Sequence, residues 1–132
     1  MAKDAIHNPK EPRHFMRLKP VPGCVRVWLG DRMIAESKSA LRLLEIGRDL
    51  YDPVFYLPPE DLNVSLSAHT KKQTHCPLKG DASYYTLPEL KLGEDEYLAW
   101  TYASPLDLAT EIAGLYAFNH KLVRIEEIGT SA

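Results

Sequence analysis

The stretch HCPLKGDASYY, residues 75–85, places a thiol, an amine and two phenols close together in the sequence. The segment from Cys76 to Lys79 (CPLK) fits a type I β-turn, because proline is favoured at the second position of such a turn. The ends of the turn lie within about 7 Å of each other, so the Lys79 ammonium comes within reach of the Cys76 sulfur. A nearby cation favours the thiolate form of a cysteine. The stretch therefore predicts a reactive thiol or a lysine at the rim of a pocket.

Aromatic side chains follow this turn and recur in a second segment, AWTY. Gly80 permits a positive φ angle or a close approach of the backbone to a ligand. Strand alternation directs Tyr84 to one face of its strand, and it places Trp100 and Tyr102 on a common face of the second segment. We expect these three rings to wall a pocket in which Lys79 supplies charge for an anionic ligand, such as a nucleotide or a carboxylate.

The same residues also permit a purely structural interpretation and an enzymatic one. A free cysteine usually behaves as a small buried hydrophobe, and a proline followed by a glycine is ordinary turn chemistry. In the enzymatic interpretation Cys76 is a nucleophile or redox thiol, and its base is His69, His75 or Lys79. Cys24 is then the candidate resolving thiol. His75 and Cys76 are adjacent, so in an extended segment they point to opposite faces.

No metal or cofactor motif is evident in the sequence. It contains no CxxC pair, no HxxxH pair and no acidic cluster at the spacing of metal ligands, so we expect no metal. A site formed by His69 with His75 or Cys76 is the alternative that the spacing leaves open. Glycine-rich phosphate loops and the GxSxG nucleophile motif are also missing from the sequence, so the cofactor stays unknown.

Composition and charge argue against several classes of protein. The 132 residues are 45% hydrophobic and 26% charged, which is typical of a single globular domain. The net charge of −2 argues against a nucleic-acid partner, and no apolar run approaches the ~20 residues of a membrane-spanning helix. Two cysteines are too few for a disulfide framework, and the first residues form no apolar leader. We therefore expect a cytoplasmic protein with free thiols and no membrane partner.

Residues 1–23 differ in composition from the rest of the chain. They contain four of the ten prolines, and five lysines or arginines against two acidic residues. Because proline removes backbone donors, we expect a Pro-rich basic arm of irregular structure. The arm is either solvated or docks on a second copy in a homodimer. A single β-rich domain is expected over residues 24–132.

Periodicity predicts one clear hairpin and two short helices. Residues 24–37 alternate between apolar and polar on both sides of a Gly-Asp turn, which is typical of a hairpin. Residues 37–47 change to a helical spacing of leucines and predict a short helix. Residues 104–114 predict a second helix, with Ser104 as N-cap and Pro105 at its first position.

Strands dominate the remainder of the chain. Residues 58–68 fit either a helical start or a strand. We expect strands at 52–59, 81–87 and 96–103, a polar loop at 69–75, and a closing hairpin around residues 119–120. Strands and helices do not alternate strictly, so a parallel βαβ fold is disfavoured. The predicted fold is mainly β: two antiparallel sheets or an open barrel, with one or two short helices.

Several of these segments together resemble the domain-of-unknown-function 427 family of small bacterial and fungal proteins. The matching stretches are VRVWLGDRMIAES, VFYLPPEDL, THCPLKGDASYY, AWTYASP and IAGLYAF, with Glu45 between the first two. They cover about residues 14–127, and THCPLKGDASYY followed by AWTYASP is the most specific part. The resemblance marks these family-pattern positions: Thr74, Cys76, Pro77, Lys79, Gly80, Ala82, Tyr84, Trp100, Tyr102 and Pro105.

The resemblance implies a fold similar to the Mss4-like β-tent group, in which two antiparallel sheets meet at an angle. Many members of that group hold zinc in paired CxxC knuckles, which this sequence lacks. The family sometimes carries a nucleotidyltransferase-type label.

Together, these observations predict a small-molecule-binding domain with a pocket around the CPLKGDASYY turn and the AWTY strand. The expected ligand contacts are Thr74, Lys79, Gly80, Tyr84, Trp100 and Tyr102. The alternatives are a cysteine-dependent enzyme or redox protein that uses Cys76 and Lys79, and a homo-oligomeric interaction module.

Overall fold

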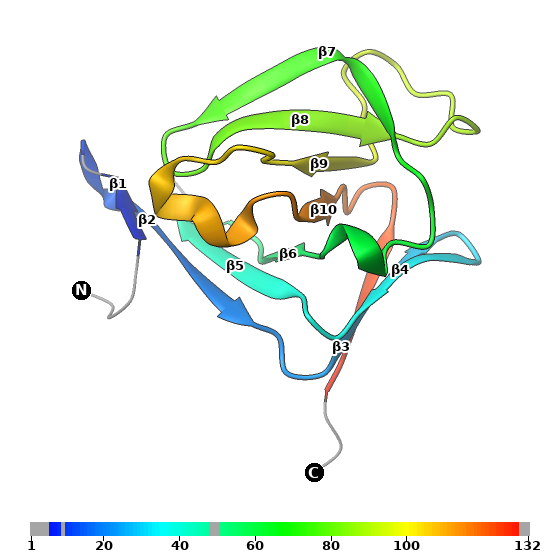
Figure 1. Ribbon diagram of the computed structural model, residues 1–132, viewed down its shortest axis with the longest axis horizontal. Coiled ribbons are helices and arrows are strands. Elements are labelled where there is room, and N and C mark those ends of the chain that lie inside the picture. Colours follow the sequence, from blue (N-terminus) through cyan, green and yellow to red (C-terminus); the bar gives the residue numbers. More distant parts are fainter. Residues whose placement is uncertain (1–5, 9, 48–50, 130–132) are drawn as a thin grey trace.

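The computed structural model describes residues 6–8, 10–47 and 51–129. Within these residues the chain forms antiparallel β-sheets and two short 3-10 helices (Figure 1). The mainly β, antiparallel fold predicted from the sequence is therefore confirmed. In the described residues the helical segments are η1 (Pro59–Asp61) and η2 (Asp107–Ile112).

Three sheets make up the fold, and each is named here by its position. The N-terminal sheet has the order β1 (Ile6–Asn8), β2 (Glu11–Pro20), β5 (Leu41–Ile46) and β6 (Val54–Tyr56). The central sheet has the order β10 (Tyr116–Phe118), β9 (Ala99–Thr101), β8 (Gly80–Thr86) and β7 (Ser67–Cys76). The outer sheet has the order β11 (Arg124–Ile128), β3 (Cys24–Leu29) and β4 (Arg32–Ser37).

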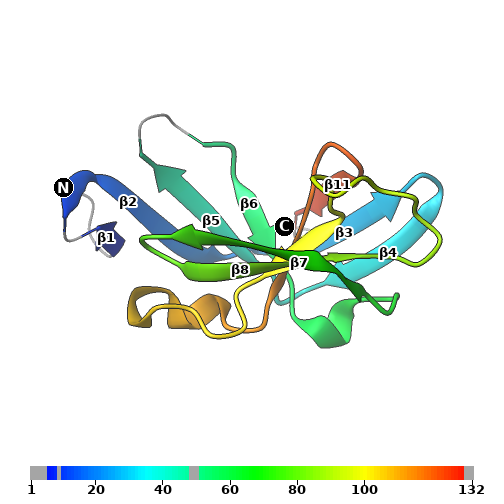
Figure 2. The same ribbon diagram turned by 90° about the horizontal axis from the view of Figure 1, so that it is seen from above.

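The N-terminal and central sheets meet along β6 and β10. Leu57 and Tyr116 exchange two backbone hydrogen bonds of 2.8 Å at this junction. Seen from above, the N-terminal sheet and the outer sheet lie to either side of the central sheet (Figure 2). The described strands do not close into a barrel. Membership of the Mss4-like group stays a prediction.

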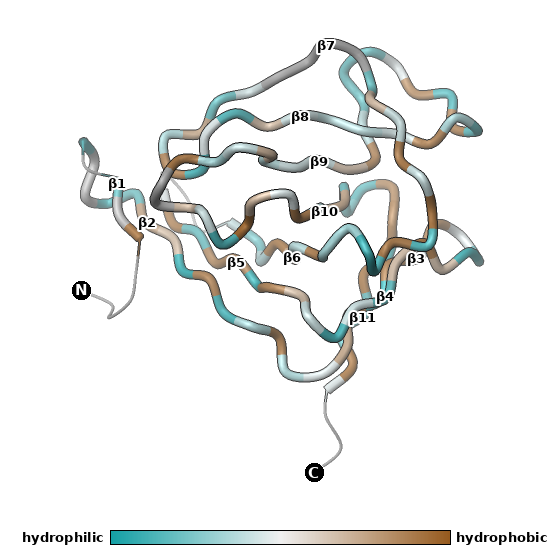
Figure 3. The backbone as a smooth tube through the Cα atoms, in the orientation of Figure 1, coloured by the Kyte–Doolittle hydropathy of each residue, from teal (hydrophilic) through white to brown (hydrophobic). Residues whose placement is uncertain are grey.

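Two clusters of buried side chains hold the sheets together. In Figure 3 hydrophobic and hydrophilic positions alternate along the strands that border them. The first cluster joins the outer sheet to the other two and includes Val25, Val27, Ile34, Leu57, Leu98 and Phe118. The second cluster lies between the N-terminal and central sheets and includes Met16, Leu43, Tyr56, Leu78, Ala82, Tyr102 and Ile112. The second cluster surrounds the candidate site.

The expectation of an irregular N-terminal arm is wrong for residues 11–20. They form β2, which pairs with β5 along its second half, and Met16 is completely buried. Pro20 is the last residue of β2, where a missing N–H interrupts the ladder least. The burial of Met16 between the sheets therefore overrides the low strand propensity of the prolines. Whether residues 24–132 fold as a unit without β2 stays a prediction.

Two further expectations in the middle of the chain are wrong. The helix expected over residues 37–47 is replaced by β5, in which Leu43 is buried while Leu44 is 42% exposed. Hydrogen bonding to β2 and β6 on either side overrides the helical spacing of the leucines. The loop expected over residues 69–75 is part of β7. Because β7 is the edge strand of its sheet, polar residues fit its solvated side.

The helix expected over residues 104–114 is a shorter, kinked 3-10 helix, η2. Its N-cap is Leu106 rather than Ser104, and no side chain caps it. The backbone N–H of Leu106 donates instead to the carbonyl of Lys79 at 3.0 Å. The start of η2 is thus set by a contact with the β7–β8 turn, which the local capping pattern does not contain.

The predicted hairpin over residues 24–37 is confirmed as β3 and β4, with Gly30 at a φ of 61° in the turn. The closing hairpin is wrong. The strands on either side of residues 119–120 belong to different sheets, because β10 pairs with β9 and β11 pairs with β3.

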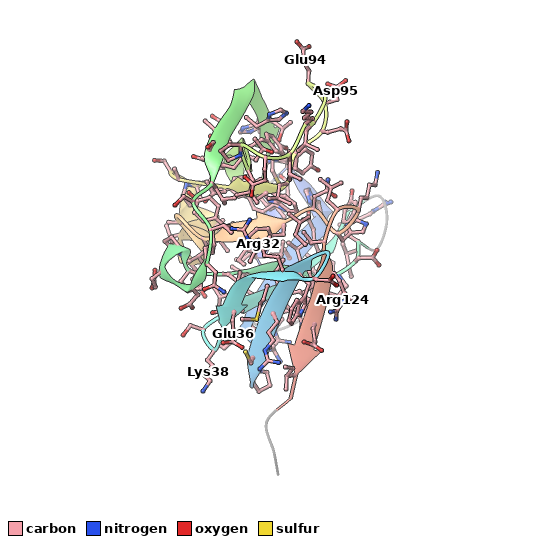
Figure 4. The ribbon with its side chains drawn as sticks, turned by 90° about the vertical axis from the view of Figure 1, so that its right-hand side faces the viewer. Arg32, Glu36, Lys38, Glu94, Asp95 and Arg124 are labelled. Atoms are coloured by element: carbon pink, nitrogen blue, oxygen red, sulfur yellow. The ribbon has the colours of Figure 1, made fainter. Side chains whose placement is uncertain are left out.

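Charged side chains lie along β4, the edge strand of the outer sheet, which is also bridged at Ala35 by Leu62. Arg32 and Glu36 lie on β4, Lys38 follows it, and all three are exposed (Figure 4). Charge at an edge strand discourages pairing with another chain. In the described part of the chain, no helix has the length and apolar character needed to cross a bilayer. The cytoplasmic location stays a prediction.

Candidate functional site

The β7–β8 turn directs Lys79 into the protein. Cys76 pairs with Gly80 across the end of the hairpin, so residues 77–79 form its turn. Gly80 has a φ of 103°, and a Cβ atom at this position would lie only 3.1 Å from the backbone nitrogen of Leu106. Glycine is therefore required both by the φ angle and by the close approach of the segment before η2. The Lys79 residue behind this turn is only 9% exposed.

Lys79 ends at a carboxylate from the opposite sheet. Its Nζ donates to Glu45 Oε1 at 2.7 Å, and His14 Nε2 lies 2.8 Å from Glu45 Oε2. His14 comes from β2 and Glu45 from β5, so these contacts join the N-terminal sheet to the central one. Asn8 on β1 approaches the other ring nitrogen of His14 at 3.4 Å. The result is a largely buried polar cluster of three titratable side chains.

Burial and ion pairing shift the pKa values of Glu45 and Lys79 in opposite directions. Burial raises the pKa of Glu45, but the Lys79 charge and the hydrogen bonds from Lys79 and His14 outweigh it, so the pKa is lowered. Burial lowers the pKa of Lys79, but its interactions with Tyr56 and Glu45 outweigh that effect, and the pKa is raised. Both shifts favour the charged pair. Lys79 is therefore held as a cation at neutral pH, and its candidate catalytic role stays a prediction.

Two buried tyrosines lie beside this ion pair. Tyr56 is completely buried, and its hydroxyl accepts a 3.4 Å hydrogen bond from the indole N–H of Trp100. Tyr102 is 6% exposed, and Lys79 Nζ lies 5.8 Å from the centroid of its ring. Burial raises the pKa of both phenols, so both stay protonated at neutral pH. No described residue forms a hydrogen bond with the Tyr102 hydroxyl.

A row of aromatic contacts runs from the surface of the central sheet towards Trp100. The hydroxyls of Thr74 and Tyr84 lie 2.6 Å apart across β7 and β8. The rings of Tyr84 and Tyr97 have centroids 4.6 Å apart, and those of Tyr97 and Trp100 are 5.8 Å apart at an angle of 85°. This edge-to-face packing fixes the orientation of the indole.

The two thiols are free and lie in different sheets. Cys24 is buried in the outer sheet, whereas Cys76 is partly exposed at the end of β7. His75 is exposed and lies 2.8 Å from Asp81 Oδ1, and His69 contacts the Gly93 carbonyl at 2.9 Å. No described side chain forms a hydrogen bond with the Cys76 sulfur.

A groove of about 880 Å³ opens beside Trp100. Aromatic side chains form much of its wall: Tyr51, Phe55, Tyr97, Trp100 and Phe118. Its polar lining includes Asp52, Asp95, Glu96, His120 and Lys121. Asp95 projects near the tip of the loop between β8 and β9 (Figure 4). Among the residues predicted as ligand contacts, Trp100 alone lines this groove.

The structure brings together some of the predicted site residues. Lys79, Trp100 and Tyr102 lie around one buried cluster, and Gly80 holds the turn that positions Lys79. Thr74 contacts the Tyr84 hydroxyl, and neither side chain has a described hydrogen bond with the Lys79 ammonium. Sequence reasoning missed His14 and Tyr56, and it noted Glu45 through the family resemblance alone. One signal was present: a lone glutamate lies among the apolar residues of LRLLEI.

Within the described residues, no group of three or more metal-ligating side chains converges. The expectation of no metal stays a prediction.

Comparison with known proteins identifies the family. A search of the curated proteins finds no match to this chain. A family model described as a domain of unknown function (DUF427) matches residues 17–129, which is most of the chain. The matched range includes β5, the β7–β8 turn and the residue after β9, and therefore Glu45, Lys79 and Tyr102. The chain belongs to the DUF427 family, as the sequence resemblance predicted.

Proposed function

We propose that this protein binds a small planar molecule in the groove beside Trp100. The observation that carries the proposal is a hollow of about 880 Å³ whose wall is formed in large part by aromatic side chains. Ligand pockets typically enclose 300–1,000 Å³ and combine apolar walls with a few polar groups. Flat aromatic walls favour a ligand that stacks against them.

The charges around the groove favour a neutral or cationic ligand. Three carboxylate side chains line it, against one lysine and one histidine. Lys79, which was expected to attract an anion, is neutralised by Glu45 at 2.7 Å. We therefore propose a planar ligand without a negative charge for the groove, in place of the anionic ligand favoured by the sequence.

A series of indoles with different charges tests this proposal. Tryptamine, indole and indole-3-acetate share one ring system and differ in charge. We expect tryptamine and indole to raise the melting temperature and to release or absorb heat in calorimetric titration, and we expect indole-3-acetate to do so less. Failure of all three to bind would refute the proposal.

Two variants locate the binding site. Tyr51 lines the groove and is 47% exposed, so Tyr51→Ser removes a wall at little cost in stability. Leu106 is 40% exposed and is not among the residues that line the groove, so Leu106→Ser is the matched control. We expect Tyr51→Ser alone to weaken binding of tryptamine. Equal binding by both variants would place the ligand elsewhere.

A thiol-based activity has weaker support. Lys79 is held as a cation by Glu45, and neither His69 nor His75 contacts the Cys76 sulfur. Among the described residues, none of the three candidate bases forms a hydrogen bond with the Cys76 sulfur, which gives this alternative less support. The enzymatic alternative and the homodimer stay predictions.

A further inference from the structure

The buried cluster around Lys79 contains hydrogen-bond donors that have no acceptor among the described residues. The ammonium carries three N–H groups, and one of them is used by Glu45. The Tyr56 oxygen accepts from Trp100, but its own O–H has no acceptor among the described residues. The Tyr102 hydroxyl has no hydrogen-bond partner in the described part of the chain, although the residue is 6% exposed. Each oxygen of Glu45 has one described partner, Lys79 at Oε1 and His14 at Oε2, and neither tyrosine hydroxyl forms a described hydrogen bond with this carboxylate.

Buried donors without acceptors lower the stability of the folded protein unless another molecule supplies the missing acceptors. A buried polar group without a partner loses its hydration and recovers nothing in return. Most buried polar groups in folded proteins have a partner, so each exception calls for a specific explanation. At Tyr102, a phenylalanine would fill the same space without this cost. The family model covers Tyr102, Lys79 and Glu45 together.

We propose that Lys79 and Tyr102 form an internal binding site for the carbonyl oxygen of a small uncharged molecule. The free N–H groups of Lys79 and the O–H of Tyr102 donate to this oxygen, and the O–H of Tyr56 is a further donor. A carbonyl oxygen matches the cluster because it accepts hydrogen bonds and has none to donate.

Charge balance decides between a carbonyl and a carboxylate. The ammonium is already paired with Glu45 at 2.7 Å, so a carboxylate ligand would add a second negative charge beside one cation. Desolvating an uncompensated charge is far more costly than desolvating a carbonyl group. The site therefore takes ketones and amides in preference to carboxylic acids.

The internal site is separate from the groove, and Trp100 lies between them. Trp100 lines the groove, and its indole N–H reaches the Tyr56 hydroxyl within the cluster. The proposal does not depend on stacking in the groove, and the two can fail independently.

The first test compares two tyrosine-to-phenylalanine variants without ligand. Tyr102→Phe removes a hydroxyl that has no described partner, so we expect an unchanged or higher melting temperature. Tyr56→Phe is the matched control, since it removes the acceptor of the Trp100 N–H, and we expect a lower melting temperature. A Tyr102→Phe protein that melts as low as Tyr56→Phe, or fails to fold, would overturn the proposal, because its hydroxyl would then already be satisfied, for example by a trapped water.

The second test uses probes built on one five-membered ring. Cyclopentanone presents a carbonyl, cyclopentanecarboxylate an anion, and cyclopentylamine a cation. We expect cyclopentanone alone to raise the melting temperature of the unaltered protein, and its carbonyl stretching frequency to fall on binding. Tyr102→Phe should lose at least half of the thermal shift, whereas Tyr51→Ser, which alters the groove, should keep it. No response to cyclopentanone, an equal response to the carboxylate, or an unchanged response in Tyr102→Phe would each overturn the proposal.

Discussion

Lys79 Nζ lies 2.7 Å from Glu45 Oε1, although the two residues are 34 positions apart and Lys79 lies in the β7–β8 turn whereas Glu45 lies on β5 of another sheet. Both side chains are largely buried, with exposed fractions of 11% and 13%. The contact joins the β7–β8 turn to β5 and closes the space between the N-terminal and central sheets. It is therefore a structural link as well as part of the candidate site.

Removing one partner of this ion pair should cost more than removing both charges. We expect Lys79→Met to lower the free energy of unfolding by about 3 kcal/mol, because it leaves the Glu45 carboxylate buried without its cation. The double variant Lys79→Met/Glu45→Gln should recover part of this loss, since the glutamine is uncharged and its oxygen still accepts from His14. Urea denaturation of the single and double variants measures the coupling. Additive losses would show that the two charges do not interact.

The stability of the protein should fall in acid because of Glu45. Its pKa is lower in the folded protein than in the unfolded chain, so its stabilising effect is present above the ordinary carboxyl pKa of about 4.3. That effect is lost as the pH falls through the folded pKa. Lys79 behaves in the opposite sense: its raised pKa stabilises below about 10.4, and the effect is lost as the pH rises through the folded value.

Melting temperatures measured from pH 2 to 7 test the acid side of this prediction. The unaltered protein should lose stability more steeply below about pH 4.3 than Glu45→Gln, which has no carboxyl group to protonate at this position. Asp31 is exposed in the β3–β4 turn, and Asp31→Asn is the matched control for the removal of one carboxylate. Identical profiles for the unaltered protein and Glu45→Gln would contradict the assignment.

Gly80 should be less replaceable than Gly30, the glycine of the β3–β4 turn. Its φ of 103° is unfavourable for any residue with a Cβ, and that atom would also lie 3.1 Å from the Leu106 nitrogen. We expect Gly80→Ala to destabilise the protein by about 2 kcal/mol. Gly30→Ala is the matched control, because Gly30 has a positive φ of 61° but open space around it. Equal losses in thermal unfolding would mean that the contact with Leu106 contributes nothing.

The N-terminal strand should be needed for stability. Met16 is completely buried between the N-terminal and central sheets, so we expect Met16→Ala to cost about 3 kcal/mol in urea unfolding. Lys19 lies on the same strand and is exposed, and Lys19→Ala should change little. A neutral Met16→Ala would instead support the predicted division of the chain after residue 23.

The parts of the fold that were predicted correctly from the sequence are those determined by residues close together in the chain. The β3–β4 hairpin follows from alternation and a Gly-Asp turn, both within residues 24–37. The strand state of β5 depends on pairing with β2 and β6, which a helical spacing of leucines conceals. The same holds for η2, whose start depends on a hydrogen bond between Leu106 and Lys79. Long-range hydrogen bonds therefore decided the elements that local patterns misassigned.

In the candidate site, too, the features with local causes were predicted and the long-range contacts were missed. The turn chemistry of CPLKG and the shared strand face of Trp100 and Tyr102 are local, and they identified one side of the cluster. The partner of Lys79 comes from the opposite sheet, and His14 meets Glu45 across 31 positions of sequence. No local pattern specifies such contacts. The groove was missed for the same reason, because its lining comes from separate segments between residues 51 and 125.

The two cysteines should differ sharply in reactivity, which tests the remaining enzymatic alternative. Cys76 is partly exposed and Cys24 is buried, so folded Cys24→Ser protein should react with iodoacetamide much faster than folded Cys76→Ser protein. In the Cys24→Ser background, Lys79→Met should slow the reaction of Cys76 if the Lys79 ammonium stabilises the thiolate. The rate should stay unchanged if the ammonium is neutralised by Glu45 and does not stabilise the thiolate. We expect the second result, since Glu45 neutralises Lys79. A large loss of rate in the Lys79→Met protein would restore Cys76 as a nucleophile candidate, whereas a Cys76 that reacts only after unfolding would end that role.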